Sequence, residues 1–246
     1  MQMTLPEAGP LNVAIIMDGN GRWGLGQGLS RADGHLAGVE AVRRTVEAAP
    51  ELGVTTLTLF AFSADNWRRP EAEVDGLMRL FRSYLATDGE RLVESGARLL
   101  AIGRRDRLPP DLAEAASRLE AATAAGDRLV LRIALDYSSR AEIVRAAAAL
   151  GADGSIEDFD RLIGGASRGG PVDLLIRTGG ERRLSDFLLW ESAYAELWFT
   201  DRMWPDFGPA DLARAIADFR RRDRRFGAIV DDAAGAPAAV RRGVAA

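Results

Sequence analysis

The residues best suited to chemistry lie in short polar segments, each of which directly follows an apolar run. The first segment, Asp18-Gly-Asn-Gly-Arg-Trp, begins with a carboxylate that could bind Mg²⁺. Its two glycines would let successive backbone N–H groups approach one phosphate. A tight turn with Asp18 as a cap residue is an equally open interpretation, because short glycine motifs are common. Further segments of this kind begin at Ser63, Asp136 and Arg177.

Arginines are concentrated in or just after these segments, and the chain contains no lysine. The five arginines concerned are Arg22, Arg31, Arg69, Arg177 and Arg183. Their mutual repulsion would be costly without an anion to neutralise them, because few acidic residues stand nearby. Since a guanidinium matches a phosphate group with two parallel hydrogen bonds, the cluster predicts a site for one or two diphosphates. Trp23 and Trp67 could cover apolar substrate carbon there, although ordinary packing explains each of them as well.

Several other kinds of chemistry are disfavoured by residues that the sequence lacks. Without cysteine there is no disulfide framework, no zinc–thiolate site and no cysteine nucleophile. Without lysine there is no lysine-bearing phosphate loop. The single histidine, His35, has no serine and acid at triad spacing, and Asn20 stands where a two-aspartate phosphatase would need its second acid. Chemistry in which diphosphate is the leaving group therefore fits these residues better.

The elements that must position these segments are predicted by hydrophobic periodicity. Near-continuous apolar runs are typical of strands that are covered on both faces of a parallel sheet. We predict strands at Leu11–Met17, Thr55–Phe62, Ala97–Ile102, Leu129–Leu135, Val172–Ile176 and Glu196–Thr200. Because the carboxyl ends of parallel strands share one edge of the sheet, the four polar segments should converge at that edge.

Helical spacing of apolar residues between these runs predicts one α/β domain. We expect helices at Leu36–Val46, at Leu112–Ala125, at Ala141–Leu150, at Ile156–Ile163, at Asp211–Arg222, and over a longer stretch that follows Pro70 and includes Val74–Leu85. No repeat or linker divides the chain, so we expect a catalytic domain over residues 1–230. The segment 231–246 is rich in alanine, glycine and proline and is expected to be a disordered tail.

Composition narrows the environment and the partners of the protein. The formal charge of −4 argues against nucleic acid as a partner, because nucleic-acid binders usually present a basic surface. The first ten residues show no secretory signal. The longest uncharged run, Gly53–Ala64, falls short of the roughly 20 residues of a membrane-spanning helix. A soluble, cytoplasmic protein is therefore expected.

Four blocks of the sequence resemble, in the same order, the signature blocks of the cis-prenyltransferase (undecaprenyl diphosphate synthase) family. The blocks are Asp18-Gly-Asn-Gly-Arg-Trp23, Ser63-x-x-Asn66-Trp67-x-Arg69-Pro70, Arg177-Thr-Gly-Gly-Glu181-x-Arg183-x-Ser185 and Tyr194-Ala-Glu196-Leu. The resemblance runs from about Val13 to Gly227. It implies a single domain with a central, mostly parallel sheet surrounded by helices, and an apolar tunnel for the growing isoprenoid.

The resemblance also implies a reaction. Isopentenyl diphosphate would be joined to an allylic diphosphate such as farnesyl diphosphate, with Mg²⁺ as cofactor, to give a cis polyprenyl diphosphate of the undecaprenyl type. A short-chain or irregular synthase of secondary metabolism is the alternative within this class. A non-catalytic partner subunit and a general phosphate-binding or phosphatase protein are alternatives from other classes. The intact Asp18 block argues against the non-catalytic partner subunit.

The resemblance assigns roles residue by residue. Asp18 resembles the catalytic, metal-binding aspartate, Asn66 the asparagine implicated in proton removal, and Glu196 a second carboxylate tied to metal binding. The residues that resemble substrate-binding positions are Gly19, Asn20, Gly21, Arg22, Trp23, Arg31, His35, Ser63, Trp67, Arg69, Arg177, Arg183 and Ser185. Arg225 and Gly227 resemble an element that reaches the partner's site in family homodimers. A peripheral membrane contact during product release is left open.

Four departures from the family pattern leave product length and acceptor choice undetermined. Ala64-Asp65 stands where Ser-Glu is common, and Arg182 replaces a frequent histidine. Asp136-Tyr-Ser-Ser-Arg140 stands where Asn-Tyr-Gly-Gly-Arg is common, and Arg132 lies inside an apparent core strand. The candidate tunnel residues are Ala61, Leu77, Leu80, Phe81, Tyr84 and Leu85, for which core packing is an equally good explanation. The small Ala61 favours a medium or long product.

Overall fold

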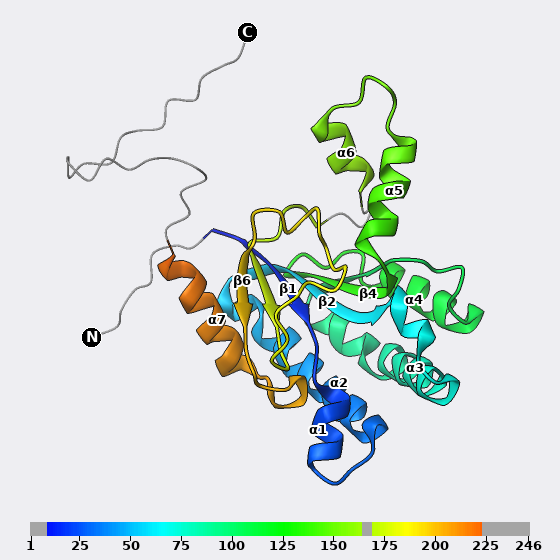
Figure 1. Ribbon diagram of the computed structural model, residues 1–246, viewed down its shortest axis with the longest axis vertical. Helices are drawn as coiled ribbons and strands as arrows, with labels where there is room; N and C mark the ends of the chain where they lie inside the picture. Colours follow the sequence, from blue (N-terminus) through cyan, green and yellow to red (C-terminus); the bar gives the residue numbers. More distant parts are fainter. Residues whose placement is uncertain (1–8, 164–168, 223–246) are drawn as a thin grey trace, which may run out of the picture.

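The computed structural model describes residues 9–163 and 169–222, which form an α/β structure around one six-stranded parallel sheet (Figure 1). The strand order is β3-β4-β2-β1-β5-β6. The strands are β1 (Leu11–Ile16), β2 (Val54–Ser63), β3 (Ala97–Ile102), β4 (Leu129–Tyr137), β5 (Leu174–Arg177) and β6 (Glu196–Phe199). All six predicted strands are confirmed, because apolar runs of this length suit strands that are buried on both faces.

The helices cover the two faces of the sheet unequally. The helices are α1 (Asn20–Gly26), α2 (Arg31–Ala48), α3 (Glu71–Glu94), α4 (Pro110–Ala122), α5 (Ser139–Ala149), α6 (Ile156–Leu162) and α7 (Pro209–Arg221). Side chains of α2, α3, α4 and α7 share one core with strand residues such as Ile15 and Leu57. On the other face, Ala14 and Leu175 pack against Phe187 and Leu188, which lie between β5 and β6. Helices α5 and α6 project away from the sheet (Figure 1).

The topology creates a crevice between the ends of β1 and β5. After β1 the chain continues to β2 on one side, whereas after β5 it continues to β6 on the other side. Ligands in open α/β sheets bind where successive connections diverge in this way, beyond the carboxyl ends of the strands. The last residues of the two strands, Ile16 and Arg177, are register partners, so Asp18 and Arg177 meet at this point.

Short-range capping explains how the chain enters the elements around this crevice. Ser30 caps α2 by accepting a hydrogen bond from the N–H of Asp33, which bonds back to Ser30. The short 3₁₀ helix η2 (Ala64–Arg68) begins in the same way, with Ser63 and Asn66 as the reciprocal pair. Gly53 has a φ of 82° and ends the 3₁₀ turn η1 (Pro50–Leu52) that follows α2. A third 3₁₀ turn, η4 (Trp204–Asp206), packs on α2 through a hydrogen bond from the indole of Trp204 to the Gly38 carbonyl.

The six predicted helices are confirmed, and α1 is one that the sequence did not predict. For its segment the sequence left a phosphate-binding loop and a tight turn equally open, because no apolar stripe marks it as a helix. Pro70 proves to be the N-cap of α3 and not its first residue. The predicted tail, residues 231–246, lies outside the described residues. In the described ranges, none of the helices is long and apolar enough to cross a membrane.

Arg132 is buried in β4, as its position in an apolar run implied. Its side chain is 1% exposed, and one terminal nitrogen donates to Thr58 Oγ1 over 3.3 Å. Burial lowers the pKa of Arg132, and the nearby carboxylate of Glu191 opposes that effect. The charge of Glu191 therefore offsets part of the cost of burying this arginine.

Candidate active site

A cavity of about 630 Å³ opens at the crevice between β1 and β5. It is lined by thirteen of the predicted site residues: Asp18, Gly19, Asn20, Gly21, Arg22, Arg31, His35, Ser63, Asn66, Arg69, Arg177, Arg183 and Ser185. Three of the four polar segments therefore converge as expected. Five arginines face two aspartates, Asp18 and Asp65, in this lining. Such an excess of guanidinium groups suits a ligand that carries several negative charges.

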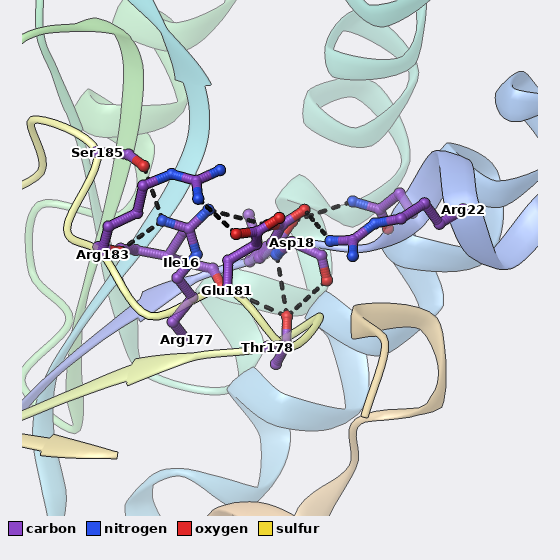
Figure 2. A network of polar contacts seen from close by, with 10 residues as sticks. Ile16, Asp18, Arg22, Arg177, Thr178, Glu181, Arg183 and Ser185 are labelled. Atoms are coloured by element: carbon purple, nitrogen blue, oxygen red, sulfur yellow. Dashed lines mark hydrogen bonds and ion pairs between the residues drawn. The ribbon is translucent and has the colours of Figure 1, made fainter. Parts of the chain in front are cut away.

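Asp18 and Arg177 form the centre of the polar network (Figure 2). Asp18 Oδ2 accepts a hydrogen bond from Arg177 over 2.9 Å, and Oδ1 accepts one from Arg22 over 3.1 Å. Thr178 holds the backbone of Asp18, because its hydroxyl accepts from the N–H over 2.9 Å and donates to the carbonyl over 2.7 Å. The carboxylate is thus fixed between two cations at the cavity wall.

Arg177 also anchors the loop that follows β5. Its side chain is 5% exposed, and it donates to Ser185 Oγ over 2.7 Å and to the Arg183 carbonyl over 2.5 Å. Ser185 has a φ of 50°, so its backbone adopts a conformation that needs such support. Arg183 pairs with Glu181 and is 62% exposed, which leaves its guanidinium at the mouth of the cavity.

Asp18 is ionised at neutral pH. Burial alone would raise the pKa of Asp18, but the hydrogen bonds and charges of Arg177 and Arg22 outweigh burial and lower it. A carboxylate of this kind can act as a ligand for a hard cation or as an electrostatic partner, but it cannot donate a proton at neutral pH.

Gly19 and Gly21 let the first turn of α1 reach the cavity for different reasons. Gly19 has a φ of 108°, and a Cβ on it would lie 2.6 Å from Met203 Sδ. Gly21 does not have a positive φ, but a Cβ there would come within 3.1 Å of the Arg31 guanidinium. The first N–H groups of α1 lack partners within the helix, so they can bind an anion. The segment for which the sequence suggested a phosphate cradle is thus built as a helix start.

Glu73 organises a second group of basic side chains and was missed by the sequence interpretation. Its carboxylate lies 2.8 Å from Arg69, 3.7 Å from Arg31 and 3.7 Å from His35. Burial lowers the pKa of His35, and Arg69 adds to that effect, while Glu73 opposes it. His35 is therefore neutral at pH 7 in the absence of an anion. The i,i+4 spacing of Arg69 and Glu73 was the signal that could have identified this residue.

Asn66 is oriented by a hydrogen bond to its amide oxygen, which leaves its –NH₂ group as the free donor. Its Oδ1 accepts a hydrogen bond from the Ser63 N–H over 3.0 Å, which directs the other end of the amide elsewhere. The remaining –NH₂ group is a donor without acceptor capacity. Asn66 can therefore bind a diphosphate oxygen but is not itself a base.

The fourth polar segment does not line the cavity, because Asp136 is buried beneath it. Asp136 accepts a hydrogen bond from the Trp67 indole over 2.9 Å and is paired bidentately with Arg107. Trp67 packs edge-on against Phe62, with ring centroids 5.1 Å apart. Asp136 thus supports η2 from below, and Arg107 explains why a carboxylate is tolerated at a buried position.

We expect Arg107→Ala to destabilise the protein by about 2–4 kcal/mol, because it leaves the Asp136 carboxylate buried without its counter-ion. In an Asp136→Asn background, the same change should cost less than about 1 kcal/mol. Urea unfolding of the original protein, the two single variants and the double variant measures the free energy of unfolding of each, and so the cost of Arg107→Ala in both backgrounds. Equal costs in both backgrounds would contradict the ion pair as the support of η2.

Three further predicted site residues lie away from the cavity lining. The indole of Trp23 donates to Asp206 over 2.8 Å. Glu196 is the first residue of β6, its register partner is Leu174, and it pairs with Arg222 over 2.7 Å. Trp67 faces Asp136, as described above. Arg225 and Gly227 lie outside the described residues.

The donor set around Asp18 is compatible with Mg²⁺. Among residues 9–163 and 169–222, there is no cluster of three or more histidine and acidic side chains that could hold a metal ion by itself. Mg²⁺ commonly binds through one or two carboxylates together with water and substrate phosphates. Asp18, with its carboxylate at the wall of an arginine-lined cavity, fits that mode.

An apolar cavity of about 90 Å³ continues from the polar one, between α2, α3 and the sheet. The two cavities share Ala61 and Leu77, and the apolar one is also lined by Leu80, Phe81 and Tyr84. Leu85 lines a smaller void of about 30 Å³ behind it. A polar, cationic pocket that opens into an apolar passage suits a molecule with a charged head and a hydrocarbon tail.

Comparisons with known proteins agree with this architecture. Residues 16–227 match the family model described as "Putative undecaprenyl diphosphate synthase". Isoprenyl transferase 1 of Bradyrhizobium diazoefficiens is 60% identical over 221 residues, which are 89% of this chain and 90% of that protein. Ditrans,polycis-undecaprenyl-diphosphate synthase ((2E,6E)-farnesyl-diphosphate specific) of Pseudomonas aeruginosa is 48% identical over 227 residues, with 89% and 90% covered. The crystal structure of lavandulyl diphosphate synthase from Lavandula x intermedia with dimethylallyl diphosphate superposes with a TM-score of 0.85 at 36% identity, covering 88% of this chain and 98% of that one.

Proposed function

Because this chain belongs to the undecaprenyl diphosphate synthase family of prenyltransferases, we propose that it condenses isopentenyl diphosphate with an allylic diphosphate to build a cis polyprenyl diphosphate. The observation that carries this proposal is the Asp18–Arg177 contact at the wall of a cationic cavity that continues into an apolar passage. The undecaprenyl-type product is supported by the printed name of the Pseudomonas relative. The catalytic domain would extend to about residue 230.

The residues of the cavity divide into two diphosphate sites. The allylic diphosphate would lie on the first turn of α1, near Arg22, Arg31 and His35. The isopentenyl diphosphate would lie near Arg177, Arg183 and Ser185. The donors of both groups are preorganised, since Glu73 holds the first set and the loop after β5 holds the second.

The reaction breaks the bond between the allylic carbon and its diphosphate and forms one carbon–carbon bond. Arg22 and Arg31 would stabilise the charge that develops on the departing diphosphate. Mg²⁺ held by Asp18 would supply further charge neutralisation when bound. The isopentenyl double bond supplies the electron pair, and loss of a proton restores a double bond. Asn66 would position the diphosphate oxygen that takes this proton.

The experiment that tests this proposal is a primer series. Purified protein is incubated with labelled isopentenyl diphosphate, Mg²⁺ and, separately, dimethylallyl, geranyl, farnesyl or geranylgeranyl diphosphate. We expect a metal-dependent lipid product whose length is set by the protein. Omission of the metal should abolish product formation, whereas product formed equally well with EDTA would contradict the role given to Asp18.

The affinity for the allylic diphosphate should rise as the pH falls. His35 is neutral in the free protein because its pKa is lowered, and a bound diphosphate would raise that pKa again. Binding then takes up a proton, so the KM should fall by up to about tenfold per pH unit as the pH falls from about 8 to about 6. In His35→Gln, the KM for the allylic diphosphate should lose the pH dependence that comes from His35 and keep the one that comes from titration of the diphosphate itself. If the KM of the variant had the same pH profile as that of the original protein, proton uptake by His35 would be contradicted.

A short-chain or irregular synthase is the second candidate, and the similarity to lavandulyl diphosphate synthase favours it. The lining of the passage should decide between the two. Ala61 stands where the polar cavity joins the apolar one, so Ala61→Leu should narrow the passage and shorten the products. The rate of the first condensation serves as the internal control and should change less than about threefold. An unchanged product distribution would remove Ala61 from the substrate path.

Further proposals concern the setting of the enzyme. We place the reaction in the cytoplasm, in a homodimer to which Arg225 and Gly227 of each subunit contribute, and with a peripheral membrane contact during product release. Sedimentation of the full chain, alone and with vesicles, tests the dimer and the membrane contact. A fully active monomer would contradict the homodimer. Equal product release with and without vesicles would contradict the membrane contact.

A further inference from the structure

A line of cavities follows α3 from the active site to the far edge of the sheet. The apolar cavity next to the active site contains Leu77 and ends at Tyr84. Tyr84 also lines a groove of about 330 Å³, which includes Leu92 and the first residues of β3 and β4, Ala97 and Leu129. From Leu77 to Leu92 the helix rises by about 22 Å. The passage therefore spans the sheet from its carboxyl edge to its amino edge, with Tyr84 as the joint between two hollows.

The groove reaches the surface of the protein. Exposed charged residues, among them Glu47, Glu94 and Arg128, form its outer rim, while Val46, Leu92 and Leu129 form an apolar floor. A hydrocarbon chain that passed Tyr84 would find apolar contacts there and then solvent. The groove thus has the character of an exit and not of a closed end.

A buried ion pair between α2 and α3 lies at the joint. Arg43 of α2 donates to both carboxylate oxygens of Asp88 of α3, each over 2.7 Å. The Asp88 side chain is 5% exposed, and Thr87 Oγ1 donates to it over 2.9 Å. Both members of the pair line the groove together with Tyr84. The pair therefore joins the two helices on the far side of the apolar cavity.

The passage is too narrow for a prenyl chain while the helices stay in this position. A cavity of about 90 Å³ corresponds to roughly three water molecules in the liquid, so the seam between α2 and α3 must widen to hold a tail. Widening at the far end requires Arg43 and Asp88 to separate. Asp88, whose side chain is 5% exposed, would then lose its bidentate partner, which is unfavourable for a buried carboxylate, whereas Arg43 is 25% exposed and keeps its contact with Glu40.

We infer that the Arg43–Asp88 ion pair is a gate that sets the upper length of the product. The apolar tail advances along α3 as units are added, and it stops where further advance would part the pair. Only a tail that parts the pair would continue into the groove beyond Tyr84. This inference rests on the proposed function, because it concerns the tail of the product made there. It assigns the length limit to a buried charge pair and not to the bulk of a single side chain.

The test replaces the whole pair, since a single truncation would leave one charge buried. Arg43→Leu combined with Asp88→Leu should fold, because apolar residues often replace a buried ion pair without loss of stability. The matched control is a second bidentate arginine–aspartate pair, which joins Arg82 of α3 to Asp111 of α4 and is exposed. Tyr84→Leu is an additional variant that widens the joint and leaves the ion pair intact.

Product lengths are measured with labelled isopentenyl diphosphate and farnesyl diphosphate for all four proteins, with circular dichroism to confirm folding. We expect the Arg43/Asp88 double variant to lengthen the mean product by at least one five-carbon unit and Tyr84→Leu to lengthen it by less. The Arg82/Asp111 double variant should keep the original distribution. If the Arg43/Asp88 variant does not fold, lengthening of the mean product by one unit or more in Tyr84→Leu, which keeps the ion pair, overturns the gate.

The outcomes separate this inference from the function on which it rests. A folded Arg43/Asp88 variant with the original distribution, or an equal shift in the Arg82/Asp111 control, would overturn the gate alone. Absence of any prenyl product from the unsubstituted protein would overturn the proposed function, and the gate with it.

Discussion

Asp18→Ala should lower turnover at least about 10²–10³-fold while leaving the fold intact. The carboxylate lies at the end of β1 with 28% of its side chain exposed, so its removal creates no core cavity. It accepts hydrogen bonds from Arg22 and Arg177, and both arginines would lose their shared anchor. Steady-state rates at saturating substrate, with circular dichroism and thermal unfolding on the same samples, measure the effect.

The control for this change is Asp206→Ala, which removes a nearby aspartate that bonds the Trp23 indole outside the cavity lining. Its turnover should stay within about threefold of the original. Asp18→Asn would keep the shape of the side chain and lose the charge, and it should be nearly as inactive as alanine. Near-full activity of a well-folded Asp18 variant would refute both the electrostatic and the metal-binding role.

Arg177→Lys should lower kcat/KM about 10²-fold, although it preserves the positive charge. Arg177 contacts Asp18, Ser185 Oγ and the Arg183 carbonyl at the same time through a planar group. A lysine ammonium is a single point with a different reach and cannot satisfy all three. Both the orientation of Asp18 and the loop that carries Arg183 should therefore loosen, which raises the KM for isopentenyl diphosphate more than that for the allylic substrate.

Arg182→Lys is the matched control, because Arg182 lies in the same loop, is exposed and is not part of the cavity lining. That variant should behave like the original protein within about twofold. If Arg177→Lys also retained full kcat/KM, the hydrogen-bond network that Arg177 forms around Asp18 would not be needed for catalysis. A KM effect confined to the allylic diphosphate would instead reverse the assignment of the two diphosphate sites.

The sheet and the place of the site could be predicted from the sequence because both depend on short-range patterns. Near-continuous apolar runs such as Leu129–Leu135, which only Arg132 interrupts, have few stable alternatives to a strand buried on both faces. Polar residues at the end of such a run must lie at the edge of the sheet, which brought Asp18, Ser63 and Arg177 together. Strand order was not predictable, because register and pairing depend on contacts far apart in the chain.

Predictions from side-chain type alone were less reliable. The residue type left Trp67 open between covering the substrate and ordinary packing, and its indole donates a hydrogen bond to Asp136 beneath η2. Asp136 was expected at the edge of the cavity, yet β4 continues through it to Tyr137. Glu73 was not recognised, because its role depends largely on Arg31 and His35 of α2, in addition to Arg69, which directly follows η2. The contacts of Glu73 with α2 are tertiary and leave no periodic signal, so only the i,i+4 spacing from Arg69 pointed to it.

The most direct test of the central claim is the stoichiometry of the first condensation. Farnesyl diphosphate and labelled isopentenyl diphosphate are mixed with excess protein and Mg²⁺, and both the released diphosphate and the new lipid are quantified. We predict one diphosphate released for each five-carbon unit incorporated, with a new double bond of Z geometry. Release of phosphate or diphosphate without carbon–carbon bond formation would contradict the account and would indicate a phosphate-ester hydrolase.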